Sequence, residues 1–541
     1  MRATFFIVLL AFLFGLAATM STPDKYHGDE LFYTDAAMRM CHSGDYWTPY
    51  WDNGNIRLRK PIMTYWTIVG SFQLFGINIF ASRLPALLAG VGLLVLTFLT
   101  GRTIFNSAEI AMFAMLITAS NLEVMRIATR ATPDALLCFF LMLSMYGFAR
   151  IWFQQDRGFW GPLLAFGGMG LAVQTKGLLG LTPLLANALF YLLARPGRSG
   201  LRALWRPVPL IIGIALAIFW YAIMFQRHGA GALREFFDDQ VSAKVSTNPL
   251  FLLSNPFVYC VSVIQYFPVW TLVLVACAIF SRKELIEFWR QNRSQCVFLL
   301  SLLVVAIVSF SFGNMRRSRY LTVAYPLVAC ALAAAIHSLA AGKVAQLWLA
   351  RASIGIGLLL ALVGALVTLT GFWIGPRWGI GGGLLLGLGA AGVMVAGAKL
   401  PLWRWLWISA VFLVGFVAQG ACFRPILSPS PLPKLTRELL AMKPELSTVY
   451  THEAQPRVAG IIRILSGGKL KVQTITSIPV EGVAHFPAPV VTPNPEPLRK
   501  ANYTLVRVEP DTPLTHTKIF GQNVRAQAFW IGLKGPGPDD N

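Results

Sequence analysis

Two adjacent carboxylates open the first polar stretch of the chain, and a lysine follows in the same stretch. They are Asp29 and Glu30, with Lys60 further along. A carboxylate can act as general base toward a hydroxyl group, and a lysine can stabilise a phosphate leaving group in a water-poor site. Each also has a structural interpretation, because acids suit a first helical turn and lysines often reach the membrane surface. Considered alone, the carboxylate pair favours the structural interpretation.

The composition is that of a protein surrounded largely by lipid. Of the 541 residues, 55% are hydrophobic and 13% are charged, and the mean hydropathy is +0.59. A soluble protein has about a quarter of its residues charged. Apolar runs that could cross about 30 Å of hydrocarbon recur along most of the chain. We therefore predict an all-α polytopic membrane protein.

The net charge of +22 does not indicate a nucleic-acid partner. The basic residues fall in short loops between apolar runs, where they set orientation and contact lipid headgroups. The seven cysteines are odd in number, form no C-x-x-C pair and lie mostly in apolar runs. We therefore expect neither a disulfide framework nor a zinc site.

The hydrophobic pattern predicts about 13 transmembrane helices. The first covers 5–20. Arg2 before it would also suit a signal peptide, but the many apolar segments that follow favour a first span. The later spans are predicted at 80–100, 107–120, 133–153, 159–174, 178–194, 207–225, 257–280, 296–312, 320–339, 353–373, 379–397 and 403–421.

Lysine and arginine positions predict a cytoplasmic N-terminus and an outward C-terminus. Basic residues concentrate in the loops that would then face the cytoplasm, such as 195–206 and 282–293. One outward cluster breaks this rule and is therefore a candidate for chemistry: Arg316, Arg317 and Arg319.

The composition changes after Phe423. A proline-rich linker is followed by a polar stretch in which we expect strands at 447–451, 470–474, 503–508 and 526–531, with helices at 434–442 and 457–465. The pattern predicts a transmembrane domain at 1–422 and a small α/β domain at 423–541, on the outward (periplasmic) side. The latter shows no phosphate loop, nucleophile elbow or metal spacing, so we expect no catalytic role for it.

The first outward loop, 21–79, is far longer than usual, at about 60 residues. Residues 29–41 have helical spacing, and 62–75 form an amphipathic segment too polar to span the membrane. We expect both helices to lie along the membrane face.

Ordered motifs run through this loop and beyond it. In the loop they are Asp29-Glu30-x-x-Tyr33, Gly44-Asp45-x-Trp47-x-Pro49, Lys60-Pro61-x-x-x-Tyr65-Trp66, Phe75-Gly76 and Arg83-Leu84-Pro85. Downstream are Thr132-Pro133-Asp134, Gln174-Thr175-Lys176-Gly177, Pro256-Phe257-x-Tyr259, Phe267-Pro268-x-Trp270 and Arg319-Tyr320-Leu321 with Pro326. From about residue 20 to 340 this set resembles the GT-C glycosyltransferases. More narrowly, it is similar to the protein-mannosyltransferase-like branch that includes bacterial aminoarabinose transferases of lipid A.

The resemblance implies a GT-C fold, a bacterial inner membrane, and an inverting transfer of a sugar from a polyprenyl (undecaprenyl) monophosphate to an extracytoplasmic acceptor. The acceptor would be lipid A, another envelope glycan or a protein. Asp29 matches the catalytic acid position, with Glu30 beside it. The residues expected to contact substrate are Lys60, Tyr33, Asp134, Lys244, Arg317, Arg319 and Tyr320.

The sequence departs from the aminoarabinose transferases at several places. Phe32 replaces an arginine that contacts the lipid phosphate, Arg59 replaces an acid, and Asp239-Gln240 replaces a Glu-His pair. Residues that could ligate a metal are thus missing, and we expect no metal and no cofactor. The identity of the sugar and of the acceptor stays open.

Several alternatives remain at this point. The chain could be a flippase or other transporter of a lipid-linked substrate, although no internal repeat is visible, or a non-catalytic envelope assembly subunit. Asp134 would serve equally as a helix cap. For Lys176 the favoured interpretation is a contact with lipid headgroups. For three nearby charged residues it is pairing among themselves: Glu123, Arg126 and Arg130. We expect a monomer in contact with membrane lipids.

Overall fold

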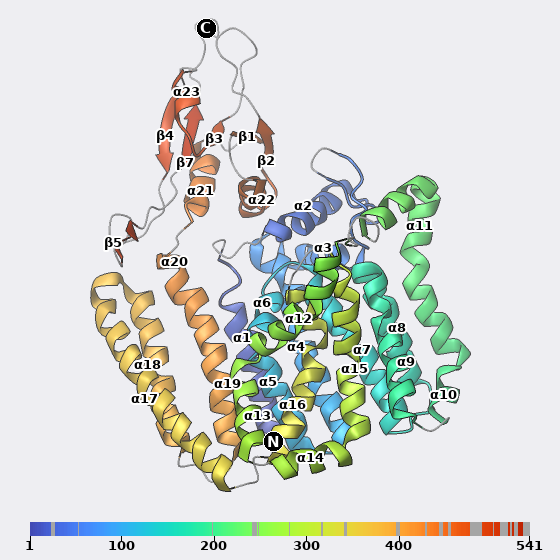
Figure 1. Ribbon diagram of the computed structural model, residues 1–541. Helices are drawn as coiled ribbons and strands as arrows, with labels where there is room; N and C mark the ends of the chain where they lie inside the picture. The colour runs from blue at the N-terminus through green and yellow to red at the C-terminus, as the bar shows by residue number, and fades with distance from the viewer. Residues whose placement is uncertain are drawn as a thin grey trace, which may run out of the picture.

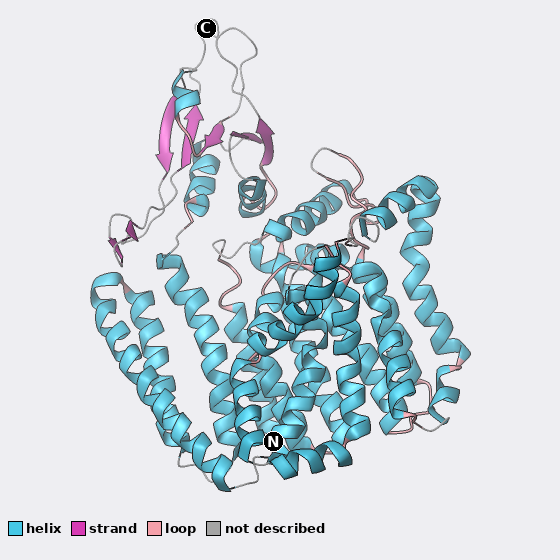
Figure 2. Cartoon of the chain, in the orientation of Figure 1, coloured by secondary structure: helices cyan, strands magenta, loops and turns pink. Residues whose placement is uncertain are grey.

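The computed structural model describes residues 1–533 except 23–27, 52–53, 197–198, 241–245, 247, 281, 315–317, 340–342, 397–400, 428–429, 443–446, 453–455, 476–488, 501–502, 509–517, 520–521 and 524–528. Helices form a bundle, and a small sheet stands beyond one end of it, which we call the sheet end (Figures 1 and 2). The N-terminus lies at the opposite end (Figure 1).

The first half of the bundle runs from the N-terminus to a long kinked helix. Its elements are α1 (Arg2–Ala17), α2 (Gly28–Ser43), α3 (Met63–Phe75), α4 (Ile79–Phe105), α5 (Ala108–Ala119), α6 (Leu122–Ala128), α7 (Pro133–Phe153), α8 (Trp160–Lys176), the 3₁₀ helix η2 (Gly177–Leu181), α9 (Thr182–Ala194), α10 (Ser199–Leu204) and α11 (Pro207–Gln240).

The second half completes the bundle. Its elements are α12 (Pro249–Tyr266), α13 (Pro268–Phe280), α14 (Arg282–Gln291), α15 (Arg293–Ser311), the 3₁₀ helix η4 (Ser318–Ala324), α16 (Tyr325–Leu339), α17 (Lys343–Ile374), α18 (Pro376–Ala396), α19 (Pro401–Val417), the π-helix η5 (Ala418–Phe423) and α20 (Arg424–Leu427).

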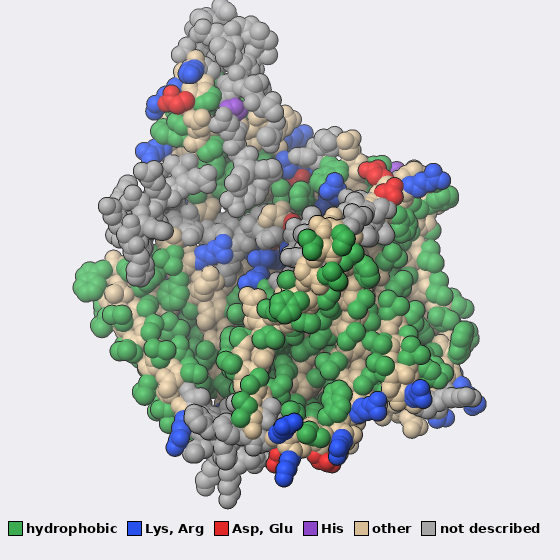
Figure 3. Space-filling view, viewed as in Figure 1, with side chains coloured by type: hydrophobic (Ala, Val, Ile, Leu, Met, Phe, Trp, Pro, Cys, Tyr) green, Lys and Arg blue, Asp and Glu red, His purple; other side chains and the backbone are tan. Residues whose placement is uncertain are grey.

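The bundle has the surface of a multi-pass membrane protein. Nine helical segments of the described chain are long and apolar enough to cross a membrane, or eleven if two bent helix pairs are each counted as one span. Figure 3 shows a band of hydrophobic side chains across the face of the bundle in view, with charged side chains above and below it. The predicted fold class is confirmed, while the number of about 13 spans stays a prediction.

The span predicted at 257–280 is wrong as a single helix. It consists of α12 and α13, which are bent by 91° relative to each other. The bend falls at Pro268, which lacks the N–H needed to continue the helical hydrogen bonds. A second bend, of 68°, separates α5 from α6.

These two bends contact each other. The Asn121 side chain donates to the Tyr266 carbonyl at 3.0 Å, and the Trp270 indole donates to the Ser120 hydroxyl at 3.0 Å. Where a helix is broken inside a membrane, its polar groups must be paired within the protein instead of facing lipid. The two hydrogen bonds between the bends provide such pairing.

The chain reverses after α8. Gly177 has a φ of +67°, a region that glycine enters at low cost, and a Cβ on Gly180 would lie 2.3 Å from the Val173 nitrogen. The 3₁₀ helix η2 therefore folds back onto α8. This reversal leaves Lys176 at the end of α8.

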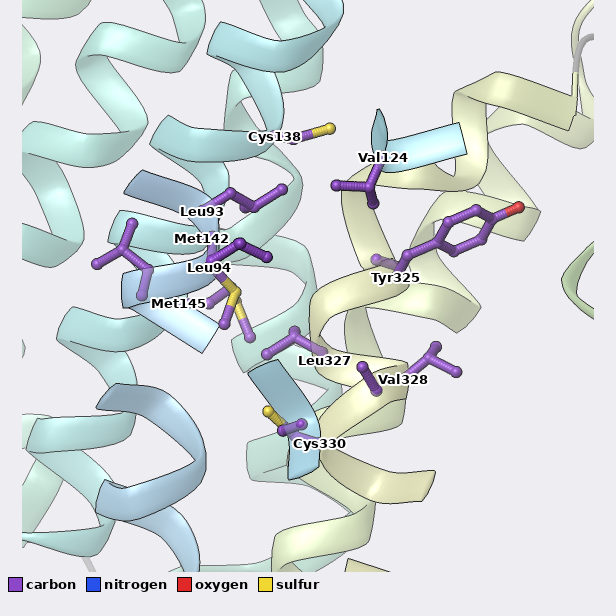
Figure 4. Close-up of a cluster of buried hydrophobic side chains, with 14 of the residues drawn as sticks. Leu93, Leu94, Val124, Cys138, Met142, Met145, Tyr325, Leu327, Val328 and Cys330 are labelled. Carbon is purple, nitrogen blue, oxygen red and sulfur yellow. The ribbon is translucent and has the colours of Figure 1, made fainter. Parts of the chain in front are cut away.

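A continuous apolar core joins the helices below the sheet end. It combines residues of α4, α6, α7, η4 and α16, several of which Figure 4 shows converging from different helices. The labelled side chains are Leu93, Leu94, Val124, Cys138, Met142, Met145, Tyr325, Leu327, Val328 and Cys330. Elsewhere, glycines allow close packing of α17 on α18: a Cβ on Gly389 would lie 2.3 Å from the Ala361 nitrogen.

The C-terminal sheet domain, 432–533, contains a five-stranded mixed sheet in the order β2-β1-β3-β7-β4. β1 pairs in parallel with β2 and β3, and β7 pairs antiparallel with β3 and β4. The predicted strands and helices correspond to β1 (Thr448–His452), β2 (Lys471–Ile475), β4 (Thr504–Val508), β7 (Phe529–Leu533), α21 (Leu432–Met442) and α22 (Pro456–Leu465). Elements not predicted are β3 (Val490–Thr492), α23 (Glu496–Lys500), β5 (Lys518–Ile519) and β6 (Gln522–Asn523).

The helix α2 is tied to the bundle by a buried ion pair. Arg83 of α4 donates from Nε and Nη2 to the two carboxylate oxygens of Glu30, at 2.8 and 3.1 Å. Both side chains are 0% exposed. The Ala131 backbone N–H also donates to Glu30, at 3.0 Å, and Arg83 donates to the carbonyl of Met20 at 2.6 Å. The pair thus joins α2, α4 and the segments beside α1 and α7.

Arg83→Met should destabilise the protein strongly, because it leaves the Glu30 carboxylate buried without its cation. Breaking a buried pair costs about 3–5 kcal/mol, whereas losing an exposed pair costs about 0–1 kcal/mol. Thermal unfolding of the detergent-solubilised protein measures this, with Arg499→Ala, from the exposed Glu496 pair, as control. Equal melting temperatures for the two variants would show that the pair is not an anchor.

Candidate active site

The ends of four elements bring charged side chains together at the sheet end of the bundle. Asp29 lies in the first turn of α2, Asp134 in the first turn of α7, and Lys176 is the last residue of α8. Arg319 and Tyr320 come from η4, which precedes α16. These residues were all singled out in the sequence.

Asp29 forms an ion pair with Arg319. Arg319 Nη2 donates to Asp29 Oδ2 at 2.7 Å, with the side chains 18% and 35% exposed, respectively. The carboxylate is therefore held in place but remains accessible. Arg319 Nε is buried and makes no hydrogen bond to any described residue. It is a charged donor available to an anion, such as a phosphate oxygen.

Asp134 forms a second pair with Lys176. Lys176 Nζ lies 2.6 Å from Asp134 Oδ1, and the Thr132 hydroxyl lies 3.3 Å from Oδ2. Lys176 therefore does not extend to the headgroups, contrary to the favoured interpretation. Asp134 is not the cap of α7 either, because Thr132 occupies the N-cap position.

The two pairs belong to one cluster. Lys176 Nζ lies 5.1 Å from the centroid of the Tyr320 ring, and Tyr320 stacks on Phe310 with centroids 4.9 Å apart. The Arg319 guanidinium lies within electrostatic range of the Asp134 carboxylate as well as of Asp29. The arrangement alternates acids and bases around Arg319.

Tyr33 lies in an aromatic enclosure around Arg57, a residue that the sequence analysis did not single out. The Arg57 guanidinium carbon lies 5.3 Å from the Tyr33 ring centroid, 5.3 Å from that of Phe32 and 4.6 Å from that of Trp51. Arg57 also donates to the Tyr65 hydroxyl. Burial raises the pKa of the Tyr33 phenol, so Tyr33 stays protonated and can donate a hydrogen bond. The only sequence signal for Arg57 was its place in the basic run before Pro61.

Glu30 is positioned differently from its neighbour Asp29. Its carboxylate is fully buried against Arg83 and faces away from solvent. Successive helical residues are rotated by about 100°, so adjacent side chains cannot face the same partner. The placement suits a structural role for Glu30 better than the catalytic role expected from the sequence.

The two arginines in and after α6, Arg126 and Arg130, differ in their partners. Glu123 pairs with Arg126, as the sequence favoured. Arg130, expected in the same group, has no hydrogen-bond or ion-pair partner for its guanidinium among the described residues, and it lies within electrostatic range of Glu30 and Arg319. It was not predicted as a site residue, and it adds a positive charge beside Arg319.

Lys60 lies in the turn before α3 and is half-buried, close in sequence to Arg57 and Tyr65. Lys244 and Arg317 lie outside the described residues. Within the described chain, His, Cys, Asp and Glu side chains form no group of three that could hold a metal ion.

The Gly44–Pro49 motif holds the loop before α3 against α11. Asp45 accepts hydrogen bonds from the Trp47 and Thr48 backbone N–H groups and forms an ion pair with Arg227 at 3.1 Å. Partial burial opposes ionisation, but these partners outweigh it and lower the pKa of Asp45. His228 Nε2 lies 3.1 Å from the Thr48 hydroxyl.

Comparison with known proteins is consistent with this geometry. Residues 59–225 match the dolichyl-phosphate-mannose-protein mannosyltransferase family. The chain is 28% identical to an uncharacterized protein of Aquifex aeolicus, over 64% of this chain and 66% of that one. It is 26% identical to undecaprenyl phosphate-alpha-4-amino-4-deoxy-L-arabinose arabinosyl transferase 1 of Pseudomonas fluorescens, over 62% of this chain and 60% of that one. In both cases less than two thirds of the relative's length is covered.

The fold is similar over almost the entire chain to that of a solved structure. ArnT from Cupriavidus metallidurans bound to undecaprenyl phosphate superposes with a TM-score of 0.70, at 16% sequence identity, over 99% of each chain. The apo state of the same protein superposes with a TM-score of 0.68. The chain therefore has the GT-C fold and resembles, in sequence and in architecture, the aminoarabinose transferases of the GT-C glycosyltransferases.

Proposed function

We propose that the protein is a membrane glycosyltransferase that moves a sugar from a polyprenyl monophosphate to an acceptor hydroxyl at the sheet end of the bundle. The observation that carries the proposal is the accessible Asp29 carboxylate, held by Arg319 beside the Asp134–Lys176 pair. The relatives named for undecaprenyl phosphate-linked aminoarabinose support this class of donor. Lipid A, another envelope glycan or a protein would be the acceptor.

Asp29 acts as general base in this mechanism. An acceptor hydroxyl bound beside it attacks the anomeric carbon of the donor sugar and transfers its proton to the carboxylate. The bond between the anomeric carbon and the phosphate oxygen breaks, and polyprenyl monophosphate leaves with the electron pair. A single displacement of this kind inverts the anomeric configuration. Arg319 orients the carboxylate through the 2.7 Å contact.

The charges around Asp29 suit a phosphate leaving group. Asp29 and Asp134 are balanced by Arg319 and Lys176. Arg130 adds a cation that has no carboxylate partner among the described residues. Positive charge placed in advance stabilises the phosphate as the bond breaks. We assign the phosphate contacts to Lys60, Arg319 and Tyr320, with Tyr33 as a neutral donor.

We further propose that the sheet end faces the periplasm of a bacterial inner membrane. In this arrangement the transmembrane domain covers 1–422 and the periplasmic domain 423–541. The loop at 195–206, rich in arginine, would then face the cytoplasm, in agreement with the positive-inside rule. The protein would act as a monomer.

Asp29→Asn should lower the transfer rate by about 10²–10⁴-fold, because the amide cannot accept the acceptor proton. The measurement is the conversion of undecaprenyl-phosphate-linked sugar to undecaprenyl phosphate, followed by mass spectrometry in membranes of a deletion strain that carries the variant. Glu109→Gln, which removes an exposed carboxylate paired with His337, is the control. A rate within a few-fold of the wild type would exclude Asp29 as the base, and a transporter or assembly subunit would give that result.

Lys60→Ala and Arg319→Ala should each weaken the binding of undecaprenyl phosphate by about 10–10²-fold, since a hydrogen bond to a charged group contributes about 1.5–3 kcal/mol. Arg319→Lys should restore only part of the affinity, because lysine cannot bind the phosphate with two parallel hydrogen bonds. Native mass spectrometry of the purified protein with undecaprenyl phosphate measures the affinity. Arg290→Ala on α14 is the control, and equal affinities for the wild type and all four variants would contradict the assignment.

Cysteine labelling should confirm the orientation. A membrane-impermeant maleimide added to spheroplasts should label Ser43→Cys at the end of α2, and it should label Arg202→Cys on α10 only after the membrane is opened. Both positions are exposed. The unsubstituted protein controls for the native cysteines. The reverse labelling pattern would place the site in the cytoplasm.

A further inference from the structure

The helix α22 of the C-terminal sheet domain packs directly along α2, the helix that carries Asp29. The contact begins close to the carboxylate: a Cβ on Gly460 would lie only 1.8 Å from Leu31 Cδ1, so the α22 backbone is pressed onto a residue two positions after Asp29. A side chain at position 460 would force Leu31 to move. The two helices therefore touch at the catalytic end of α2.

A buried ion pair joins the middle of α2 to the last turn of α22. Arg463 Nη1 lies 2.6 Å from Asp35 Oδ1, with the side chains 10% and 12% exposed. The other carboxylate oxygen of Asp35 accepts from Arg39 at 3.1 Å, and Arg463 Nη2 donates to the Val472 carbonyl at 2.8 Å. Arg463 thus links α2 to strand β2 of the sheet.

The third contact lies at the far end of α2. Gly468, in the turn after α22, has a φ of +78°, and a Cβ there would lie 3.0 Å from the His42 ring. Between these contacts, one hydrophobic cluster continues from α2 through α22 to the sheet, including Ala36, Val458 and Ile462. The domain therefore holds α2 along its whole length.

We infer that the C-terminal sheet domain is a positioning element for catalysis, and that Arg463 is its principal positioning residue. This inference rests on the proposed function of Asp29. α2 does not cross the membrane, and its two faces are held by different parts of the chain: Glu30 by Arg83 of the bundle, and Asp35 by Arg463 of the domain. A displacement of about 1 Å can reduce a rate by about 10²-fold. Loosening α22 therefore moves Asp29 away from the acceptor hydroxyl without changing any group that touches substrate.

Arg463→Ala in the full-length protein should lower the rate at saturating lipid-linked donor by about 10²-fold while leaving the half-saturating donor concentration nearly unchanged. The assay is the conversion of undecaprenyl-phosphate-linked sugar to undecaprenyl phosphate. Arg499→Ala, on α23 of the same domain, should retain the wild-type rate because its pair with Glu496 is exposed and does not involve α2. A wild-type rate for Arg463→Ala would overturn the inference.

A designed disulfide distinguishes a rate lost through poor positioning of α2 from a rate lost through misfolding. The Leu31 Cβ and an ideal Cβ at Gly460 are 3.6 Å apart, within the range of about 3.5–4.5 Å for disulfides. Leu31→Cys with Gly460→Cys, added to Arg463→Ala, should recover most of the rate when oxidised and lose it again when reduced. An oxidised protein that melts cooperatively and stays as slow as the reduced one would refute the positioning role. If Asp29→Asn is inactive but Arg463→Ala is not impaired, only this inference fails, whereas an active Asp29→Asn contradicts the proposed function itself.

Discussion

The buried pair between Glu30 and Arg83 is the interaction on which the geometry of the site depends. Two charges without solvent are stable only when their remaining hydrogen-bonding positions are also filled. Here the partners are the Met20 and Thr22 carbonyls and the Ala131 N–H. These groups belong to the segment after α1 and the segment before α7. A single pair therefore sets the distance between α2, which carries Asp29, and α7, which carries Asp134.

The adjacent carboxylates show how one helical turn can separate two roles. Glu30 points into the protein and meets Arg83, while Asp29 is 35% exposed and meets Arg319. Because the buried residue fixes the rotation of the helix about its axis, it also fixes the direction in which its neighbour points. The Asp-Glu sequence thus places a candidate chemical group, Asp29, directly before a structural anchor, Glu30, on a different side of the helix.

Local pattern was sufficient to predict most elements, because hydrophobic runs and strand alternation are properties of short segments. The helix at 133–153 and strands β1, β2 and β4 were predicted to within about two residues. The bend between α12 and α13 was missed even though Pro268 is visible, since its stability depends on Asn121 and Ser120, which are distant in sequence. The pairs Asp29–Arg319 and Asp134–Lys176 likewise join residues that only the tertiary structure brings together. Family resemblance suggested these residues, but no local pattern distinguished Arg319 from its neighbours or indicated the enclosure around Arg57.

The C-terminal sheet domain illustrates why the absence of catalytic motifs is a weak guide to function. A helix of 16 residues such as α2 is only marginally stable by itself in water, so its position depends on packing. The bundle supplies that packing on one face through Arg83. On the other face the packing comes from Leu31, Asp35 and His42 against α22 and the turn after it. A domain of this kind contributes to the reaction through the free energy with which it restrains α2. Selection on such a domain would act on its contact surface, and chemistry-bearing residues within the sheet would not be required.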